Sequence, residues 1–327
     1  MDNPSLEVIK EIKQRLPNGV TLIDFFTEII PMKKEAAYRR LRGEIPLTLK
    51  EVLQVVSYFH LSLDKIFKTK EEGTYTSSIV RMSGKNLTDA YCKTIENIIN
   101  AMRFMKMDPN ANMYGAINVL PASHVYKYPT ICKFRFFKWA YQCRKTPSPL
   151  KFSEIEIPPH IRSLEKIYLE EHQQIASHFI WTKELFRPII NDIHYFSEIG
   201  LVAHEEVKTL KEEIYMLLDD LEEDISSGET KAGAPFWVYL ANTYFDANYI
   251  YVEGNNFKAS SINVFGINYL SSIEEEICND TKEWIESLMR FSTLISKSGE
   301  IEKVNFFNLQ RKLVEKPDIT NIYDIYT

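Results

Sequence analysis

The chain has 327 residues, which is long for a single domain, and 45% of them are hydrophobic, 26% charged and 13% aromatic. These proportions exclude an intrinsically disordered chain, because disordered segments carry few aromatic and few apolar side chains. The formal net charge of −6 is unevenly distributed: residues 1–70 hold an excess of about three basic side chains, so the remaining residues hold an excess of about nine acidic ones.

Residues 5–67 contain four segments with helical periodicity, each bounded by Pro, Gly or Asn. The segments are SLEVIKEIKQRL, TLIDFFTEII, KKEAAYRRLRG and TLKEVLQVVSYF. We expect Thr21 and Thr48 to cap two of these helices, because a hydroxyl at that position accepts a backbone hydrogen bond. Apolar residues repeat at three- and four-residue spacing in the first and fourth segments and predict core positions: Leu6, Ile9, Ile12, Leu16, Leu49, Val52, Leu53, Val56 and Phe59.

The third segment is strongly basic although the whole chain is acidic. Ala36, Ala37 and Leu41 are predicted to face inward, where small side chains let the helix pack closely on its neighbour. A tight break at Ile30-Pro31 separates this segment from the one before it. Short helices in this order are the layout of a helix-turn-helix unit, whose third helix enters the major groove of DNA.

The outward side chains of the third segment are candidates for contact with double-stranded DNA. Near the start of a recognition helix, side chains reach base edges, and Lys and Arg elsewhere neutralise phosphates. The predicted groove contacts are Lys33, Lys34, Glu35, Tyr38 and Arg39, and the predicted phosphate contacts are Arg40 and Arg42. Glu35 is able to accept a hydrogen bond from cytosine, and Arg39 to bind guanine with two hydrogen bonds. The alternative is a solvated basic helix in an ordinary helical bundle.

Residues 5–67 resemble the DNA-binding domain of lambda-repressor/Cro-type transcriptional regulators. The resemblance rests on AYRRLRGE, which is followed by a Pro and by TLKEVLQVVSYFHLSLDKIF, and it covers about a fifth of the chain. It implies an N-terminal four- to five-helix lambda-repressor-like domain in which the helix after the recognition helix packs beneath it, with LSLDKIF closing the domain. Phe26-Thr27 and Pro31 depart from that family, which usually has a small residue in the second helix and a Gly at the turn.

The polar stretch KTKEEGTYTSS, residues 68–78, is typical of a linker. We therefore expect a DNA-binding domain over residues 1–70, a linker over 71–85, and a regulatory or dimerisation region over 86–327. The fold class expected for the whole chain is mainly α with a small antiparallel β meander. Within it, the C-terminal region is expected to be a mixed α+β region, larger than the N-terminal domain.

The C-terminal region has several predicted elements. Residues 86–106 read as a helix, MYGAINVL as a strand, and YPTICKFRFFKWAYQC as either a buried helix or a strand. From Pro159 to about Ser226 the pattern is helical. WVYLANTYF, YIYVEGN and SSINVFGINYL predict a three-stranded meander, and two helices follow at about 273–297 and 300–315.

Two stretches of this region have alternative interpretations. Residues 212–224, EEIYMLLDDLEED, carry apolar side chains on one face and acidic ones on the other, which is typical of a solvated amphipathic helix or of a dimer seam. The aromatic run FRFFKWAY, residues 134–141, is able to line a ligand pocket, but large aromatic side chains more often form core.

Candidate catalytic and metal-binding residues are few. His172 and His178 lie six apart, whereas metal ligands on one helix are three or four apart, and His194 and His204 lie farther along the chain. We therefore expect neither a metal nor a cofactor. Ala232-Gly233 resembles the bond that self-cleaving repressors hydrolyse with a Ser-Lys pair, for which Ser260 or Ser261 with Lys297 are the candidates.

The cysteines Cys92, Cys132, Cys143 and Cys278 form no CxxC pair, which argues for free thiols in a reducing compartment. The N-terminus lacks the pattern of a signal peptide, and no run of about 18 apolar residues is present. We therefore expect a cytoplasmic protein that does not enter the membrane.

The function expected from the sequence is that of a sequence-specific DNA-binding transcriptional regulator and not of an enzyme. It would bind DNA as a homodimer, because one recognition helix reads few base pairs, and its acidic region would respond to a small-molecule or protein effector. The alternatives are a self-cleaving Ser-Lys repressor and a protein-interaction scaffold that does not bind DNA.

Overall fold

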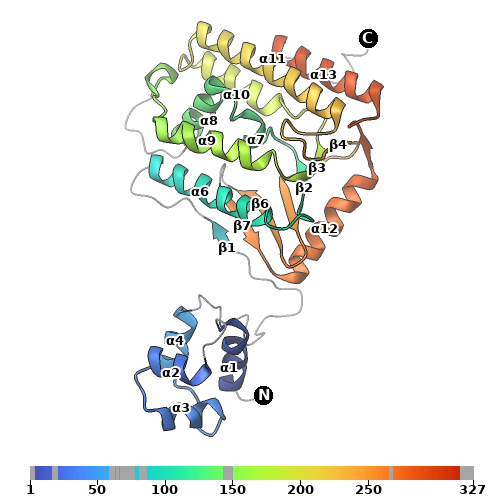
Figure 1. Cartoon of the computed structure of the whole chain (residues 1–327). Helices are drawn as coiled ribbons and strands as arrows, with labels where there is room; N and C mark the ends of the chain where they lie inside the picture. The colour runs from blue at the N-terminus through green and yellow to red at the C-terminus, as the bar shows by residue number, and fades with distance from the viewer. Residues whose placement is uncertain are drawn as a thin grey trace. The chain divides into compact units, whose positions relative to one another are not determined.

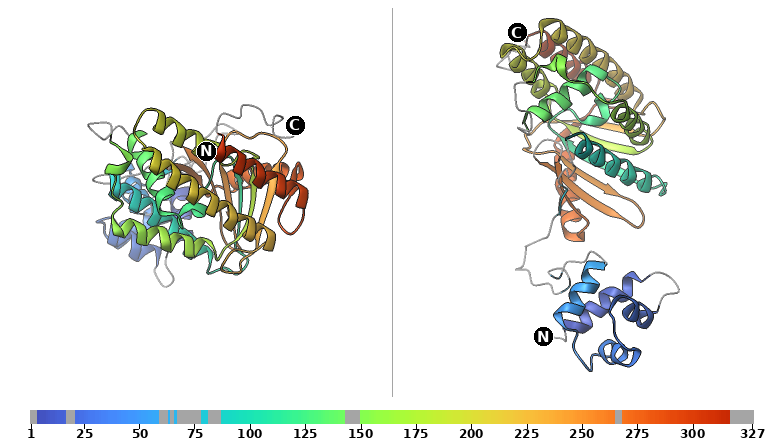
Figure 2. Two further views of the ribbon diagram at one scale, coloured as in Figure 1. Left: turned by 90° about the horizontal axis from the view of Figure 1, so that it is seen from above. Right: turned by 90° about the vertical axis from the view of Figure 1, so that its left-hand side faces the viewer.

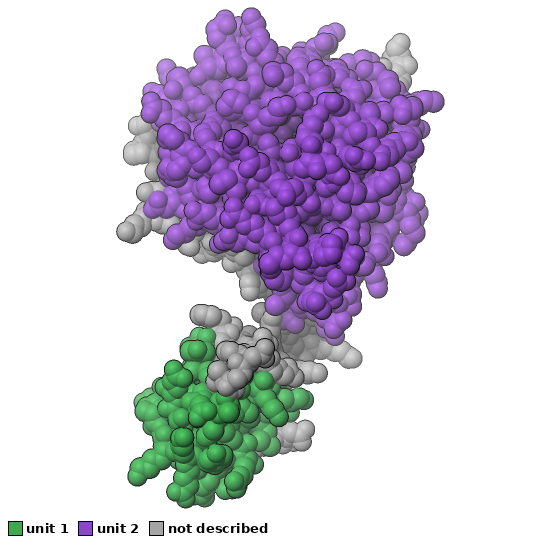
Figure 3. Space-filling view, viewed as in Figure 1, with its two compact units in different colours: residues 1–76 green, residues 77–327 purple. Residues whose placement is uncertain are grey.

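The computed structural model divides into two compact units, Met1–Thr76 and Ser77–Thr327 (Figure 3). It describes residues 4–16, 21–58, 63, 66, 78–80, 87–142, 150–264 and 268–316. Most of the predicted linker 71–85, and most of the LSLDKIF segment, lie outside the described residues.

The described residues of the first unit form the helices α1 (Pro4–Arg15), α2 (Leu22–Ile29), α3 (Lys34–Leu41) and α4 (Leu49–Tyr58) (Figure 1). They surround one apolar core made of Val8, Ile9, Ile12, Phe25, Phe26, Ile30, Ala37, Leu47, Val55, Val56 and Ile66. The four helices predicted from the sequence are thus present and in the expected order.

The predicted core face of α4 is partly wrong. Leu49 is 70% exposed and Leu53 is 48% exposed, whereas Val55 is fully buried and Val56 is 8% exposed. Apolar residues occupy most of the circumference of this ten-residue helix, so its periodicity fits two neighbouring faces. The packing against α1 selects the face that contains Val55 and Val56.

Both predicted helix caps are confirmed. The Oγ1 atom of Thr21 accepts a hydrogen bond from the Asp24 N–H at 3.3 Å, and that of Thr48 accepts one from the Glu51 N–H at 3.3 Å. Glu51 completes the second cap, because its carboxylate accepts the Thr48 N–H at 2.8 Å. The reciprocal pair is a capping box, which satisfies two backbone donors at the start of α4.

The described strands of the second unit form one mixed sheet, in the order β1-β7-β6-β5-β2-β3-β4-β8. The strands are β1 (Ser78–Val80), β2 (Asn112–Ile117), β3 (Ala176–Trp181), β4 (Phe236–Ala241), β5 (Tyr249–Glu253), β6 (Lys258–Val264), β7 (Asn268–Ser272) and β8 (Ser292–Leu294). β2, β3 and β4 run parallel to one another, and the other neighbouring pairs are antiparallel.

Helices cover both faces of this sheet (Figures 1 and 2). They are α6 (Leu87–Met105), α7 (Ala122–Val125), α8 (Pro129–Gln142), α9 (Pro159–His172), α10 (Arg187–Glu198), α11 (His204–Ser227), α12 (Glu275–Arg290) and α13 (Glu300–Glu315), with a 3-10 turn at Phe152–Glu154. Alternate residues of β3 point to opposite faces. Phe179 and Trp181 join the large core under α6 to α11 and α13, whereas Ile180 joins a smaller core under α12.

The sheet is larger than the predicted antiparallel meander, although the mainly helical, mixed α+β class is confirmed. The first predicted meander strand is β4, which instead pairs in parallel with β3. β3 itself lies in a stretch that was predicted to be helical. A short apolar run after a helix cannot be told from more helix by periodicity, and parallel pairing depends on residues far away in the chain. Residues 78–80 were expected to belong to a linker, whereas they form β1 and pair with β7.

The two stretches with alternative interpretations both pack inside the second unit. FRFFKWAY lies in α8, where Phe134 and Phe137 are each 1% exposed, so this run is core. The apolar stripe of residues 212–224 lies in α11, where Ile214 and Leu218 are buried in the same core as α8 and α13. That stripe is therefore used within the chain and is not a free dimer seam.

Candidate nucleic-acid interface

A four-residue turn joins α2 to α3 in the first unit. Ile30 ends α2 by donating its N–H to the Phe26 carbonyl at 3.0 Å, and Pro31 follows it. Pro31 has no N–H to continue the helical ladder, so the chain must leave α2 there. Phe26 and Ala37 are both fully buried in the shared core and hold α2 against α3. The geometry is that of two short helices joined by a tight turn.

One face of α3 is buried and the other is exposed, as the sequence predicts. Ala37 is fully buried, and Ala36 and Leu41 are half-buried. Six of the seven candidate side chains are exposed, namely Lys33, Lys34, Glu35, Tyr38, Arg39 and Arg42. Because five of these six are basic or aromatic, the exposed face carries positive charge and one large ring.

The end of α3 is fixed by Gly43. Its φ of 75° lies in the left-handed region, which glycine adopts without steric cost. The Gly43 N–H donates to the Arg40 carbonyl at 2.9 Å, and the Glu44 N–H donates to the Arg39 carbonyl at 2.9 Å. These two bonds make a Schellman motif, which satisfies the last carbonyls of the helix and turns the chain away.

Glu44 lies beside two of the candidate arginines. Its carboxylate is 3.5 Å from Nε of Arg39 and 3.5 Å from Nη1 of Arg42. All three side chains are about half exposed or more, so each pair contributes little to stability. The Arg42 guanidinium also lies 5.9 Å from the centre of the Tyr38 ring. Glu44 therefore aligns the two guanidinium groups in the free protein without burying them.

Arg40 differs from its neighbours because its side chain points into the first unit and not into solvent. Its side chain is 17% exposed, and its Nε donates to the Glu51 carboxylate at 2.9 Å. Burial raises the pKa of Glu51, but the hydrogen bonds from Arg40 and Thr48 outweigh it and hold that pKa below its usual range. The ion pair ties α3 to the start of α4, so Arg40 has a structural role within the unit.

Glu44 and Glu51 form ion pairs with candidate arginines, and neither pair was predicted from the sequence. The pattern Thr48-Leu49-Lys50-Glu51 carries the signal of a capping box, which identifies Glu51 as a helix-capping carboxylate. No such pattern marks Glu44. Glu44 comes close to Arg39 because Gly43 turns the chain back toward that side chain.

The residues proposed for a Ser-Lys pair are not brought together. Ser260 and Ser261 lie on β6, and Lys297 follows β8. Four strands separate β6 from β8 in the sheet, which amounts to about 24 Å between those strands at ~4.8 Å per step. Lys297 instead pairs with Glu229 at 3.4 Å. This arrangement gives no support to a self-cleaving repressor.

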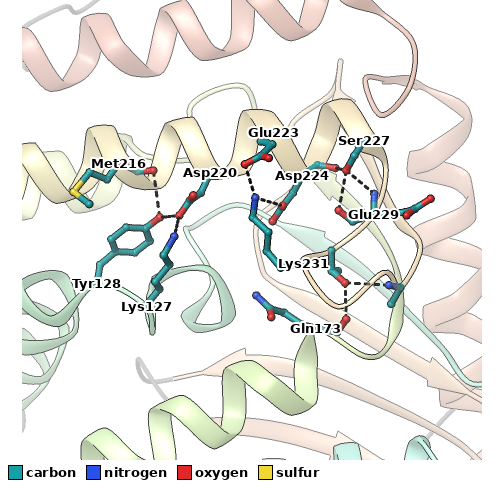
Figure 4. A network of polar contacts seen from close by, with 12 residues as sticks. Lys127, Tyr128, Gln173, Met216, Asp220, Glu223, Asp224, Ser227, Glu229 and Lys231 are labelled. Carbon is teal, nitrogen blue, oxygen red and sulfur yellow. Dashed lines mark hydrogen bonds and ion pairs between the residues drawn. The ribbon is translucent and has the colours of Figure 1, made fainter.

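Ion pairs and hydrogen bonds join the loop that contains Ala232-Gly233 to the helices around it (Figure 4). Lys231 forms ion pairs with Glu223 and, at 3.4 Å, with Asp224, both on α11. The hydroxyl of Thr230 donates to the carbonyl of Gln173 at the end of α9. Asp220, one turn earlier on α11, binds the side chains of Lys127 and Tyr128. The network makes this loop part of the packed second unit.

His172 and His178, two of the candidate histidines, lie on opposite faces of the sheet. His172 ends α9 and is stacked between Tyr168 and Phe179, with ring centres 6.2 Å away in each case. His178 is on β3, where it stacks on Tyr114 at 4.9 Å. Because residues 178 and 179 point to opposite faces of the sheet, His172 and His178 are separated by the sheet itself.

Three further properties concern metals, thiols and membranes. Over the described ranges, no group of three or more His, Cys, Asp or Glu side chains is arranged to hold a metal ion. Cys92, Cys132 and Cys278 are buried free thiols, and Cys143 lies outside the described residues. None of the helices in the described part is long and apolar enough to cross a membrane.

Comparison with known proteins bears on the first unit and its continuation. The comparison with curated proteins gave no match, and neither did the comparison with solved structures. Residues 23–108, however, match the family model of the BetR domain, and the matched segment runs from α2 through α3 and α4 to α6. The match and the geometry of α2 and α3 agree that the chain carries a regulatory domain of the helix-turn-helix type.

Proposed function

We propose that this protein is a sequence-specific DNA-binding transcriptional regulator that reads double-stranded DNA with α3. The observation that carries the proposal is the exposed basic face of α3 in a domain of the helix-turn-helix type. An α-helix with its side chains is about 10–12 Å wide, which suits the ~12 Å width of the major groove. The proposal extends the likeness to lambda-repressor/Cro-type regulators and gives the chain a binding role, not a catalytic one.

The exposed residues of α3 have distinct roles in this proposal. Lys33, Lys34, Glu35, Tyr38 and Arg39 face the groove. Arg39 is suited to guanine because its planar guanidinium donates two parallel hydrogen bonds. Arg42, at the end of the helix, contacts phosphate. Arg40 supports the position of α3 through Glu51 and does not touch DNA.

Glu44 would act on affinity through charge. In the free protein it lies near the guanidinium groups of Arg39 and Arg42, and on DNA those groups would exchange Glu44 for phosphate or base acceptors. A carboxylate near phosphate is unfavourable, so Glu44 moderates binding and keeps non-specific affinity low.

The second unit has a different task, because its excess of acidic side chains is unsuited to a DNA surface. We assign to it the dimerisation of the protein and the response to an effector. A homodimer would place two copies of α3 on half-sites about 34 Å apart, one helical turn of DNA. As part of this proposal, the regulator acts in the cytoplasm.

The test is DNA affinity as a function of salt, with fragments selected from genomic DNA. We expect the affinity to fall steeply with salt, because each phosphate contact contributes about 0.9 to the slope of log K against log salt concentration. Lys34→Ala and Arg39→Ala should each weaken specific binding by about 1–3 kcal/mol. Lys208→Ala, at an exposed position of α11, is the matched control and should leave the affinity unchanged.

Two outcomes would contradict the proposal. One is a selection that enriches no DNA sequence, and the other is binding that is equal in the intact protein and in both α3 variants. The second outcome would favour the scaffold alternative, in which the basic face of α3 is a solvated surface.

A further inference from the structure

The second unit contains a small cavity between α10, α11 and α13, three helices that pack against one another (Figure 1). Its volume is about 200 Å³. The lining residues are Ile190, Ile193, His194 and Ser197 of α10, His204, Val207, Lys211 and Ile214 of α11, and Val314 of α13. We propose that this cavity is a binding site for a small organic acid with a short aliphatic body.

The inner wall of the cavity is aliphatic. Ile190, Ile193 and Ile214 are 5%, 4% and 1% exposed, and Val314 is fully buried. A wall of this kind favours an apolar ligand body, because burying apolar surface gives about 25 cal/mol per Å² and a polar body would lose its hydrogen bonds to water.

The size of the cavity limits the ligand. An apolar cavity of about 150 Å³ accommodates benzene, which has six non-hydrogen atoms. A cavity of about 200 Å³ therefore suits a molecule slightly larger than benzene, and it is too small for a nucleotide or a typical drug-sized molecule. Hexanoate, with its five-carbon chain and one carboxylate, is of the right size.

The rim of the cavity supplies donors for a carboxylate. It carries Lys211, two imidazoles and the hydroxyl of Ser197. Lys211 is half-buried, and its side chain has no hydrogen bond or ion pair with the part of the chain that the structure describes. A half-buried cation next to an aliphatic wall gains most from an anion that brings its own apolar body.

Glu198 is an acidic residue near this rim. The carboxylate of Glu198 is 3.6 Å from Nδ1 of His194, but the Glu198 side chain is 65% exposed and points its charge into solvent. It is not among the residues that line the cavity. The lining itself thus carries hydrogen-bond donors and one cation, Lys211, without a carboxylate, and this balance favours an acid over an amine of the same length.

The site stands apart from the DNA-binding proposal, since it needs only the second unit and no DNA. Its test is calorimetric titration of the full chain with hexanoate at pH 7, alongside hexanamide and hexylamine as neutral and cationic probes of equal length. We expect saturable binding of hexanoate at one site per chain, at least tenfold tighter than either of the other two probes. Lys211→Met should weaken hexanoate at least tenfold and leave hexanamide within threefold.

Two further variants complete the test. Lys208→Met removes a cation from an exposed position of the same helix that does not line the cavity, and it should leave hexanoate binding unchanged. Val207→Phe fills the cavity and should abolish binding of all three probes. If Val207→Phe does not fold, as judged by circular dichroism, the comparison of Lys211→Met with Lys208→Met decides alone.

Absence of saturable hexanoate binding would overturn the proposal. So would equal affinity for the acid, the amide and the amine, or hexanoate binding that does not respond to Lys211→Met.

Discussion

Arg39 and Arg40 are adjacent on α3 but have opposite surroundings. The Arg39 side chain is 55% exposed beside Glu44, whereas that of Arg40 is 17% exposed and bound to Glu51. In a helix, successive side chains are about 100° apart, so one faces solvent while the next faces α4. Loss of a charge should therefore have a different effect at each position.

Substitution of these two arginines separates binding from stability. Arg39→Ala should weaken specific DNA binding by about 1–3 kcal/mol and leave the unfolding midpoint unchanged. Arg40→Ala removes the charged partner of the Glu51 carboxylate and leaves it the hydrogen bond from the Thr48 N–H. It should lower the free energy of unfolding of the first unit by about 1–3 kcal/mol. Urea unfolding and DNA titration of both variants check this, and a reversal of the two effects would contradict the assigned roles.

His172 makes the second unit sensitive to acid. Burial lowers the pKa of His172 to about 4, and burial together with the nearby His172 lowers the pKa of His124 to about 3. Both values lie below the ~6.5 of an unfolded chain, so the unfolded state binds more protons at acid pH. The stability that these neutral imidazoles provide is present above pH ~6.5 and is lost as the pH falls below it toward the folded pKa values.

Removal of His172 should therefore reduce the acid sensitivity. Between pH 7 and pH 5.5, each such histidine lowers the free energy of unfolding by about 1 kcal/mol. His172→Phe keeps the ring that stacks on Tyr168 and Phe179, and should reduce the loss over this interval by about that amount. The measurement is urea unfolding at both pH values, with His160→Phe, at an exposed position of the same helix, as the control. An equal loss in the parent chain and in His172→Phe would contradict this account.

At the scale of the element, the end of α3 depends on one backbone conformation. Gly43→Ala places a Cβ on a residue with φ of 75°, which costs about 1–2 kcal/mol. We expect the melting temperature of the first unit to fall accordingly, and DNA affinity to fall as the last turn of α3 loosens. Gly43→Asn should be less harmful, because asparagine tolerates the left-handed region better than alanine. Thermal unfolding of both variants checks the order.

The elements show which features a sequence can predict. The helices of the first unit are short segments between Pro, Gly and Asn, and the caps at Thr21 and Thr48 follow from local chemistry, so they were predicted. The place of β3 between β2 and β4 was not predicted, because it depends on pairing with residues that are 64 and 59 positions away in the chain. A run such as Ile-Ala-Ser-His-Phe-Ile-Trp gives no periodic signal that separates strand from helix.

The candidate site was predictable to a similar extent. The outward positions of Lys34, Tyr38 and Arg39 follow from the 3.6-residue period together with the inward Ala37. The interior role of Arg40 does not follow, because its partner Glu51 is on the next helix and eleven positions away in the chain. From the sequence alone, a basic residue at the edge of an exposed helix face is equally compatible with pointing to solvent or to the interior. The position of the neighbouring helix decides between the two.

At the scale of the whole molecule, the proposal predicts how the protein is arranged on DNA. A homodimer should bind a palindromic fragment whose half-sites are 10–10.5 base pairs apart, with two chains per fragment. Insertion of five base pairs between the half-sites turns them to opposite sides of the duplex and should weaken binding strongly. Analytical ultracentrifugation of the complex gives the stoichiometry, and tight binding of one chain to a single half-site would contradict the dimer.

The two units also determine where the chain is best divided for experiments. The BetR match, residues 23–108, would make a natural fragment boundary, yet it starts within α2 and stops just after α6. Such a fragment lacks Val8 and Ile12 of α1, which are fully buried in the first core, and it carries Ile95 and Ile99 of α6 without the partners that bury them. The apolar surfaces exposed in the first core and on α6 would make the fragment aggregate at the concentrations that spectroscopy requires. A fragment that begins at Met1 and ends at Thr76 avoids both faults.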